Sequence, residues 1–322
     1  MMNHRSLNAI RFAALVANKW VIRRTMIIGD AAHVFPPFGG EGIAAGLRDA
    51  IALGWRLDLI GKLDLKTDVI EKLLNGWNLE RRQGIDEATR TTMVNGRMVN
   101  MRSPVLAFLR NSVIKLLWAI PGVAEYLTQK AMCDEFYYKP CQDGFFLESQ
   151  RGGHKLSQTW LRQRSGPCRL SDDVLFMGKQ SFILLFIADD EKDSDDDIGA
   201  QLKEAELILH DANINNTVIS SRQAVILARR CFEEIDLSAG VQKDSSAFSH
   251  SIYFSCIPSM EATGMDPSAA PLMRRYNKRS MGSELGRNAS FVILRRDLYL
   301  FSVSRNIDEF QEAIGHFQSL LS

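Results

Sequence analysis

The pattern of apolar and polar positions predicts a strand, a loop and a long helix in the first sixty residues. The run TMII at residues 25–28 predicts a buried strand, because β-branched and long apolar side chains follow one another without a turn signal. Residues 44–60 predict one helix, since apolar positions recur there at helical spacing. The apolar stripe of this helix comprises Ile43, Leu47, Ala50, Gly54 and Leu57.

Further along the chain, the pattern predicts more helices and then a mixed sheet. Residues 67–97 predict a charged helix, and residues 104–120 and 122–132 predict two shorter helices whose Leu, Ile, Val and Trp side chains we expect in the core. Irregular sequence follows at 137–166. Beyond it, strands are expected in SFILLFIAD, NTVIS, HSIYFSCI and ASFVILRRDLYLFSV, with helices at 198–210 and 307–321. The fold class is therefore α/β, with a mixed sheet in the second half.

The loop between the first strand and the first helix carries two prolines and then glycines. Pro36 and Pro37 fix φ and remove two backbone donors, which makes the loop rigid. Gly39, Gly40 and Gly42 let the backbone approach a flat ligand, because no Cβ stands in the way. This composition indicates a binding loop of residues 36–42.

Polar groups for a ligand stand on both sides of this loop. Asp30 follows the strand directly, and its carboxylate can accept hydrogen bonds from sugar-like hydroxyls. The amides of Gly42, Ile43 and Ala44 form the first turn of the helix, where the macrodipole places a partial positive charge. An anionic or electron-accepting ligand fits this position.

Residues 40–45 also spell G-x-G-x-x-A, the glycine pattern of a Rossmann dinucleotide site. That pattern requires the first glycine directly after a buried strand, and an acidic residue about 20 residues further on at the end of a second strand. Here a segment with two prolines separates residues 25–28 from Gly40, and no second strand follows the helix. The Rossmann interpretation is therefore disfavoured.

Composition and charge exclude several classes of protein. A net charge of +1 predicts no bulk affinity for nucleic acid or for an anionic membrane. The apolar runs are far shorter than the roughly 20 residues of a membrane span, and residues 1–18 lack the apolar core of a signal peptide, so we expect a cytoplasmic protein. Five widely spaced cysteines predict reduced thiols and no metal site. They are Cys133, Cys141, Cys168, Cys231 and Cys256.

The stretch GDAAHVFPPFGGEGIAAGLRDAIALGWRL closely resembles the second flavin-contacting motif of the FAD-dependent aromatic-ring monooxygenases, the phenol 2-monooxygenase-like family. The resemblance implies that Asp30 binds the ribityl chain of FAD and that the backbone of residues 42–44 faces the N1 and C2 carbonyl edge of the isoalloxazine. Two residues depart from the family pattern: Ala44 replaces Asn, and Glu41 replaces Gln. The implied cofactor-binding residues are Gly29, Asp30, Pro37, Gly40, Gly42, Ile43 and Ala44.

Two other segments resemble the same family. LLNGWNLERRQ resembles its ERRP segment, with Trp77, Glu80, Arg81 and Arg82 in place and Gln83 instead of proline. The back half resembles the thioredoxin-like C-terminal domain of these enzymes, without a cysteine pair, so a structural or dimer-contact role is expected for it. The resemblance implies three parts: residues 1–136 as the C-terminal part of the FAD-binding domain, 137–165 as a linker, and 166–322 as the thioredoxin-like domain.

The implied activity is hydroxylation of an aromatic or phenolic compound with FAD, NAD(P)H and O2. The family's N-terminal βαβ unit, which holds the ADP half of FAD, has no counterpart here, so we expect a chain truncated at its N-terminus that binds FAD more weakly than a complete hydroxylase. The alternative is a non-catalytic remnant or a dimerising subunit with weak or no flavin binding; either could form a homodimer.

Two titratable residues near the motif have both a catalytic and a structural interpretation. His33 could act as a base, but the sequence favours a buried histidine bonded to backbone near the loop. Asp49 is expected to pair with Arg48, Arg56 or a backbone amide rather than to take part in chemistry. The sequence therefore assigns no catalytic residue.

Overall fold

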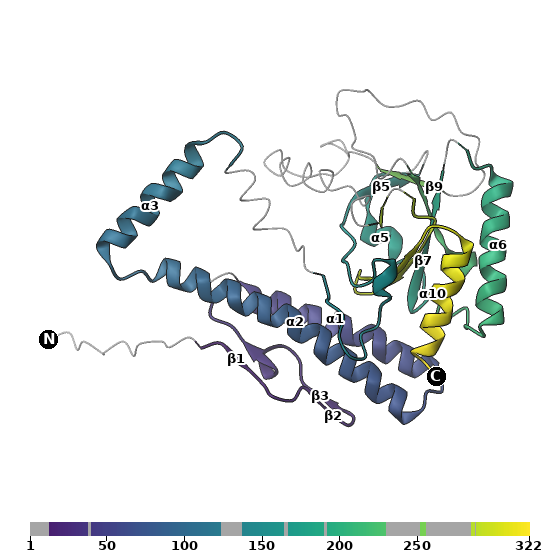
Figure 1. Cartoon of the computed structure of the whole chain (residues 1–322), viewed down its shortest axis with the longest axis horizontal. Helices are drawn as coiled ribbons and strands as arrows, with labels where there is room; N and C mark the ends of the chain where they lie inside the picture. The colour runs from purple at the N-terminus through teal and green to yellow at the C-terminus, as the bar shows by residue number, and fades with distance from the viewer. Residues whose placement is uncertain are drawn as a thin grey trace. The chain divides into compact units, whose positions relative to one another are not determined.

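The chain forms two compact units, each assembled from separate stretches of sequence. The computed structural model describes residues 13–37, 40–123, 137–163, 167–189, 192–229, 252–255, 285–286 and 288–322. The first unit comprises Met1–Leu53 and Trp77–Asp134, and the second comprises Gly54–Gly76 and Glu135–Ser322. Helices α1 (Glu41–Lys62) and α2 (Thr67–Val99) each contribute to both units (Figure 1).

Short antiparallel strand pairs open the first unit. Strand β1 (Leu15–Val16) pairs with β4 (His33–Val34), and β2 (Val21–Ile22) pairs with β3 (Thr25–Met26). The strand predicted at 25–28 is thus only two residues long, and it is exposed or half-buried rather than buried. A two-stranded ribbon has too little apolar surface to bury both of its faces. A single 3-10 turn, η1 (Gly29–Ala31), separates β3 from β4.

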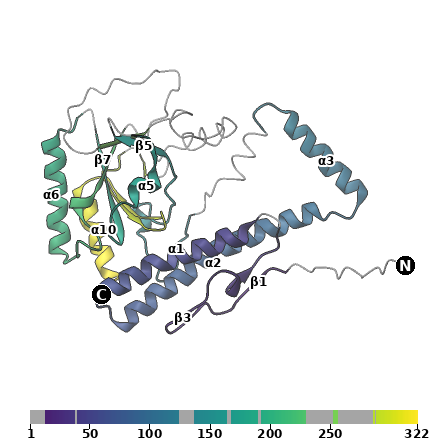
Figure 2. The ribbon, with the colours of Figure 1, turned by 180° about the vertical axis from the view of Figure 1, so that it is seen from behind.

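The long predicted helices are confirmed, but the predicted exposure of the first is wrong. α1 begins at Glu41, within two residues of Gly42, and its N-terminal half lies beside α2 (Figure 2). The expected apolar stripe faces outward, since Ile43 is 82% and Leu47 60% exposed. The buried face instead carries Ala45, Asp49 and Ala52. A polar residue on this face is stabilised only if its hydrogen bonds are satisfied there.

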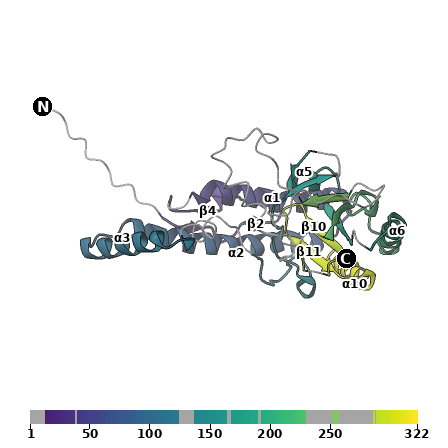
Figure 3. The same ribbon diagram turned by 90° about the horizontal axis from the view of Figure 1, so that it is seen from above.

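Helix α3 (Pro104–Ala119) was expected in the core and is exposed instead. It begins as its sequence predicts, because the Ser103 hydroxyl accepts from the amide of Leu106 and Pro104 stands at the first helical position. No residue of α3 is buried, and Phe108 is 71% exposed. Among the described elements of the first unit, none lies alongside it (Figures 1 and 3). The helix expected at 122–132 lies almost wholly outside the described residues.

A seven-stranded mixed sheet forms the second unit and confirms the α/β class. Its strand order is β11-β10-β7-β8-β9-β5-β6, with β7, β8 and β9 parallel to one another and the remaining neighbours antiparallel. Helices α6 (Asp195–Asp211) and α10 (Ile307–Ser319) lie side by side against it, while the short α5 (Ser171–Leu175) packs near β5 and β6 (Figure 1). The strands are β5 (Trp160–Gln163), β6 (Arg169–Leu170), β7 (Phe182–Ala188), β8 (Val225–Ala228), β9 (Ile252–Ser255), β10 (Phe291–Arg295) and β11 (Leu300–Ser304).

Two local predictions in this unit are corrected. Residues 216–220 (NTVIS) form a turn rather than a strand, and the 3-10 turn η3 (Ser221–Gln223) follows them. The helix predicted at 198–210 begins earlier, at Asp195, because Ser194 and Asp197 form a reciprocal capping box. The thioredoxin-like assignment itself stays a prediction.

The core of the second unit is aromatic and includes the irregular segment that precedes the sheet. Phe145 lies 5.6 Å from Phe182 and 5.4 Å from Phe317, measured between ring centroids. Trp55 from α1 packs 5.3 Å from both Phe145 and Phe182. Residues 137–159 are irregular, as expected, yet they contribute buried side chains through the 3-10 turn η2 (Glu148–Gln150) and its surroundings, whereas residues 160–163, expected to be irregular as well, form strand β5. The expected domain boundaries stay a prediction.

A buried ion pair stands beside this aromatic core. The guanidinium of Arg295 pairs with the Asp297 carboxylate at 2.5 Å, and the Trp55 indole donates to the same carboxylate at 3.1 Å. Arg295 also lies over the Trp55 ring at 4.9 Å. Because the charge of Arg295 is neutralised by Asp297 and its flat face is covered by an aromatic ring, its burial is tolerated.

Some predictions concern residues outside the described part of the chain. These are Gly39, Cys133, Cys231 and Cys256. In the part that is described, Cys141 and Cys168 form no disulfide bond, and none of the helices there has the length and apolarity to cross a membrane.

We predict that Gly76→Ala destabilises the second unit. A Cβ on Gly76 would lie 2.0 Å from the carbonyl oxygen of Asp143, so backbone would have to move. We expect the free energy of unfolding to fall by about 1–3 kcal/mol in chemical denaturation. Gly199→Ala in α6 is the matched control, because its Cβ meets nothing within 4 Å; it should raise stability by about 0.5–1 kcal/mol. Equal stability of the two variants would contradict this packing.

Candidate functional site

The seven predicted cofactor-binding residues lie in the first unit, on the η1 turn, the proline loop and the first turn of α1. Gly29 and Asp30 form η1, and the Asp30 carboxylate is exposed. Pro37 and Gly40 are exposed in the loop, where Gly40 has a φ of +69° that glycine adopts without strain. Gly42, Ile43 and Ala44 follow in α1 and are half-buried or exposed. All seven therefore retain surface for a ligand.

A close backbone contact brings η1 onto α1. A Cβ built on Gly46 would lie 3.3 Å from the Gly29 Cα, so only glycine at position 46 permits this approach without displacement. Gly29 itself has a φ of +57°. Gly46 stands about one helical turn after Gly42. The turn that carries Asp30 thus lies close to the helix N-terminus.

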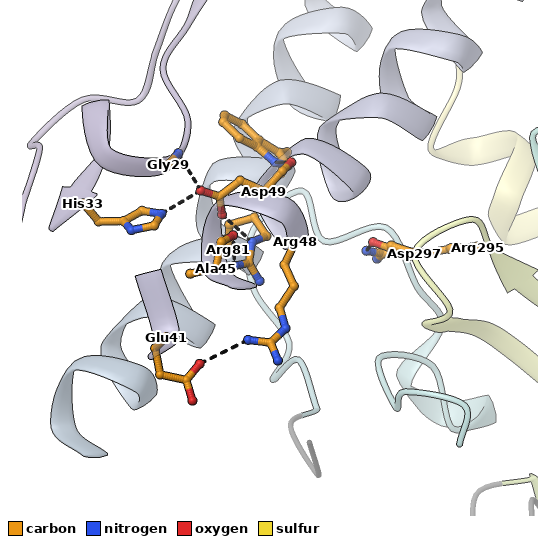
Figure 4. A network of polar contacts seen from close by, with 10 residues as sticks. Gly29, His33, Glu41, Ala45, Arg48, Asp49, Arg81, Arg295 and Asp297 are labelled. Atoms are coloured by element: carbon orange, nitrogen blue, oxygen red, sulfur yellow. Dashed lines mark hydrogen bonds and ion pairs between the residues drawn. The ribbon is translucent and has the colours of Figure 1, made fainter. Parts of the chain in front are cut away.

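One buried carboxylate fixes the same contact. The Asp49 side chain is fully buried and accepts from the Gly29 amide at 3.0 Å, from His33 Nε2 at 2.6 Å and from Arg81 Nε at 2.8 Å (Figure 4). Its donors come from η1, β4 and α2. Three separate segments therefore meet at one pair of oxygens.

The roles of Asp49 and His33 differ partly from those expected. Of the expected partners of Asp49, a backbone amide is confirmed, and the guanidinium that pairs with it is that of Arg81. His33 is buried, as expected, but it bonds to a carboxylate rather than to backbone. Because an ionised carboxylate only accepts, His33 Nε2 carries the proton of this bond. Its Nδ1 is buried without a hydrogen-bond partner among the described residues.

The environment of Asp49 favours its ionised form. Burial raises the pKa of this carboxyl, but the hydrogen bond from His33, the charge and hydrogen bond of Arg81 and the Gly29 amide together bring it below its ordinary 3.8. Asp49 is therefore charged at neutral pH and has no proton to give. Its arrangement suits holding backbone and side chains rather than acid or base chemistry.

Trp77 and the ERR segment of α2 bond to backbone carbonyls of α1 and of the connection that follows β1. The Trp77 indole donates to the Asp49 carbonyl at 3.3 Å, and Arg81 Nη2 donates to the Ala45 carbonyl at 3.4 Å. Arg82 Nη2 donates to the carbonyls of Ala17 and Asn18 at 2.6 and 2.9 Å. The sequence located this segment but did not indicate these contacts.

The charge at the start of α1 is modest. Glu41 stands in the first helical turn, where a carboxylate interacts favourably with the macrodipole. Arg48 Nη1 donates to its carboxylate at 3.4 Å, and both side chains are partly exposed. Glu41 is thus partly neutralised by its own helix, and the amides of the first turn remain the electropositive feature of this end.

Metal ligation finds no support in the part of the chain that the structure describes, where no group of three or more His, Cys, Asp or Glu side chains could hold an ion. The chemistry of the described site consists of a hydroxyl-accepting carboxylate at Asp30, backbone amides at a helix N-terminus and a glycine-lined approach. Such donors and acceptors suit a flat, partly anionic organic ligand.

We predict that the stabilisation by Asp49 disappears in acid. A carboxyl with a lowered pKa in the folded state stabilises the fold above its unfolded pKa and ceases to do so as the pH falls through its folded pKa. The difference in unfolding free energy between wild type and Asp49→Asn should be constant from pH 7 to about pH 5 and shrink below about pH 3.8. Denaturant titrations at several pH values measure it.

Asp172→Asn is the control for this measurement. Burial raises the pKa of the Asp172 carboxyl, so its protonation stabilises the folded state and the difference from wild type should change in the opposite direction on acidification. A difference for Asp49→Asn that grows in acid would contradict the assignment.

Comparison with known proteins shows similarity to flavin-dependent hydroxylases in the part of the chain that carries these residues. A family model described as an FAD binding domain matches residues 2–91, which include η1, the proline loop and the α1–α2 contacts. A 3-(3-hydroxy-phenyl)propionate/3-hydroxycinnamic acid hydroxylase of Burkholderia cenocepacia is 32% identical over 165 residues, which are 50% of this chain and 29% of that protein. A probable NADH-specific resorcinol 4-hydroxylase of Rhodococcus jostii is 34% identical over 103 residues, 31% of this chain and 18% of that protein. The chain spans less than a third of either relative.

Solved structures share the fold. The flavin-dependent monooxygenase PieE, in complex with FAD and substrate, superposes with a TM-score of 0.54 at 14% identity, covering 97% of this chain and 50% of that one. The anhydrotetracycline hydroxylase OxyS of Streptomyces rimosus gives 0.51 at 17% identity, covering 94% and 46%. Residues 2–91 of this chain thus match an FAD binding domain, and the resemblance of the chain to the FAD-dependent aromatic-ring monooxygenases is confirmed.

Proposed function

We propose that this chain provides the flavin-facing part of an FAD-dependent monooxygenase that hydroxylates small aromatic or phenolic compounds with NAD(P)H and O2. The observation that carries the proposal is the η1 turn lying on α1 at the Gly29–Gly46 contact, with Asp30 exposed and the first helical turn accessible. The named relatives are hydroxylases of phenolic compounds, which supports this substrate class.

The residues present fit FAD. Asp30 would accept hydrogen bonds from the ribityl hydroxyls, and its exposed carboxylate is available for them. A Cβ added at Gly40 or at Gly42 would meet nothing within 4 Å, so a planar ring can approach the backbone there. Gly29, Pro37, Ile43 and Ala44 would complete the contact surface.

The positive end of α1 is suited to negative charge on the cofactor. FAD, when bound, supplies the transfer of electrons from NAD(P)H to O2. The amides of residues 42–44 would stabilise negative charge near them by roughly 0.3–2 kcal/mol, since the helix is 22 residues long and its first amides lack intrahelical acceptors. Preorganised backbone donors of this kind favour the reduced, anionic state without reorganising.

Flavin binding by the chain is the direct test. We predict saturable FAD binding at about micromolar concentration or weaker, because a few contacts of roughly 1.5–3 kcal/mol each are available from Asp30 and α1. Quenching of flavin fluorescence measures it. Asp30→Asn should weaken binding about tenfold, whereas Asp86→Asn, an exposed acid on α2, should not.

Turnover separates the enzyme from the non-catalytic alternative. Oxidation of NADH and of NADPH is followed with FAD, with and without phenols, and hydroxylated products are identified by mass spectrometry. Product formed in proportion to the reductant consumed supports the hydroxylase. Flavin binding without product supports a non-catalytic flavin-binding chain, and absence of FAD binding at millimolar concentration would overturn the proposal.

The homodimer expected from the sequence also belongs to this proposal, and α3 offers a surface for it. Leu106, Leu109, Val113 and Leu116 recur with the 3-4-3 spacing of helices that pack along one another, and all are more than half exposed. We propose that two copies of the chain pair along this stripe.

Light scattering after size exclusion tests the pairing. The wild type should elute as a dimer, and the double variant Leu109→Glu, Leu116→Glu should elute as a monomer. The substitutions should change the unfolding free energy of the single protomer by less than about 0.5 kcal/mol, as expected for exposed positions. A monomeric wild type would refute the pairing.

A further inference from the structure

Outside the proposed ligand contacts, the first unit contains a buried charged group with no evident chemical task. Asp49 is fully buried, as are His33 and, to within 3%, Arg81. Removing an ionised carboxylate from water costs several kcal/mol unless donors replace the water. Its three donors, the Gly29 amide, His33 and Arg81, replace the water.

The donors explain why the η1 turn stays where it is. Strands β1 to β4 are two residues long and form no larger sheet in the described chain, so strand pairing alone holds this region weakly. The hydrogen bond from the Gly29 amide to Asp49 and the close Gly29–Gly46 contact hold the turn directly against α1. His33 ties β4 to the same oxygen.

Helix α2 locks the carboxylate in its orientation. Arg81 binds the second oxygen, Oδ1, and leaves Oδ2 for Gly29 and His33. Arg81 Nη2 and the Trp77 indole bond to the carbonyls of Ala45 and Asp49 on α1. The carboxylate therefore cannot rotate without losing bonds to α2 and η1 together.

We infer that Asp49, held by Arg81 and His33, is a positioning residue for the flavin: it sets the η1 turn, and with it Asp30, against the N-terminal turn of α1. The inference rests on the proposed function. Asp49 itself touches no ligand, because its carboxylate is buried on the face of α1 toward α2 and η1 (Figure 4). Its effect on the ligand passes through the Gly29 amide, one residue before Asp30.

This assignment differs from a purely structural role in what it predicts. Removing a purely structural ion pair lowers only the free energy of unfolding. Removing a positioning residue also changes the hydrogen exchange of one amide, and it lowers the affinity for one ligand by more than the loss of stability explains. Asp58 on the same helix provides the comparison. Its carboxylate accepts from Ser181 Oγ at 2.6 Å and Lys62 Nζ at 2.9 Å, within the second unit.

The experiment compares wild type, Asp49→Asn and Asp58→Asn in three measurements. These are hydrogen exchange of the Gly29–Ala31 amides without FAD, FAD affinity by fluorescence quenching, and unfolding by denaturant. We expect Asp49→Asn to speed exchange at Gly29 and to weaken FAD binding by about tenfold to a hundredfold, the effect of losing a hydrogen bond to a charged group. Asp58→Asn should lower stability without either effect.

Gly46→Ala provides an independent variant that keeps the carboxylate. Its Cβ would displace η1 by a few tenths of an ångström, while alanine favours the helix, so FAD affinity should fall with stability maintained. This variant decides the matter if Asp49→Asn does not fold.

Unchanged FAD affinity in both Asp49→Asn and Gly46→Ala, or an equal loss in Asp58→Asn, would overturn the inference. If wild type and variants alike fail to bind FAD, the proposed function fails, and the flavin part of the inference with it. In that case, hydrogen exchange at the Gly29 amide still shows whether Asp49 holds the η1 turn. Unchanged protection of this amide in Asp49→Asn would refute that Asp49 holds the turn.

Discussion

The first unit depends on the ionised carboxylate of Asp49 being kept out of water. An unpaired buried charge is among the most costly features a fold can contain, so the chain must bring donors to it from wherever they lie in the sequence. Those donors are the Gly29 amide, His33 and Arg81. Satisfying one side chain thereby fixes the relative positions of η1, β4, α1 and α2, and places the exposed residues of the motif around one helix N-terminus.

This constraint also explains Gly46 and Arg81. Gly46 is needed because the η1 turn approaches α1 closely enough for its amide to reach Asp49. Arg81 donates to the Asp49 carboxylate. Its neighbour Arg82 donates to the carbonyls of Ala17 and Asn18 and lies over the Trp20 ring at 5.1 Å. The ERR segment thus joins α2 to the β1–β2 connection and to α1 through two adjacent side chains.

Sequence patterns predicted the elements better than the faces they bury. The extents of α1 and α2 and the strand β7 follow from periodicity and continuous apolar runs, which are local properties, whereas the single apolar run at 289–303 did not show its division into β10 and β11. The buried face of α1 could not be predicted in that way, because Asp49 and Arg56 are inside and Ile43 and Leu47 are outside. Hydrophobic periodicity assumes that polar residues face water, and it fails where a polar network forms the contact. Likewise, the apolar side chains of α3 predicted a helix buried in a core, but within the described chain none of them is buried.

The pairing of Asp49 with Arg81 follows from the helical hairpin once the bounds of α1 and α2 are known. Asp49 stands 13 residues before the end of α1 at Lys62, and Arg81 stands 14 residues after the start of α2 at Thr67. Two helices joined by a short connection run antiparallel, so residues at equal distance from the connection face one another. The pairing of His33 does not follow in this way, because its position depends on the path of two-residue strands. The partners of a buried charge can therefore be predicted within a helical hairpin but not across irregular chain.

In the function proposed for this chain, the N-terminal turn of α1 faces the flavin because Asp49 holds η1 beside it. Hydrogen exchange of the amides of Gly42, Ile43 and Ala44, measured with and without saturating FAD, tests it most directly. We expect FAD to slow exchange at these three amides and to leave exchange at the amides of strands β7 and β10 unchanged. FAD-dependent protection confined to the second unit, or saturable FAD binding that leaves residues 42–44 unprotected, would contradict it.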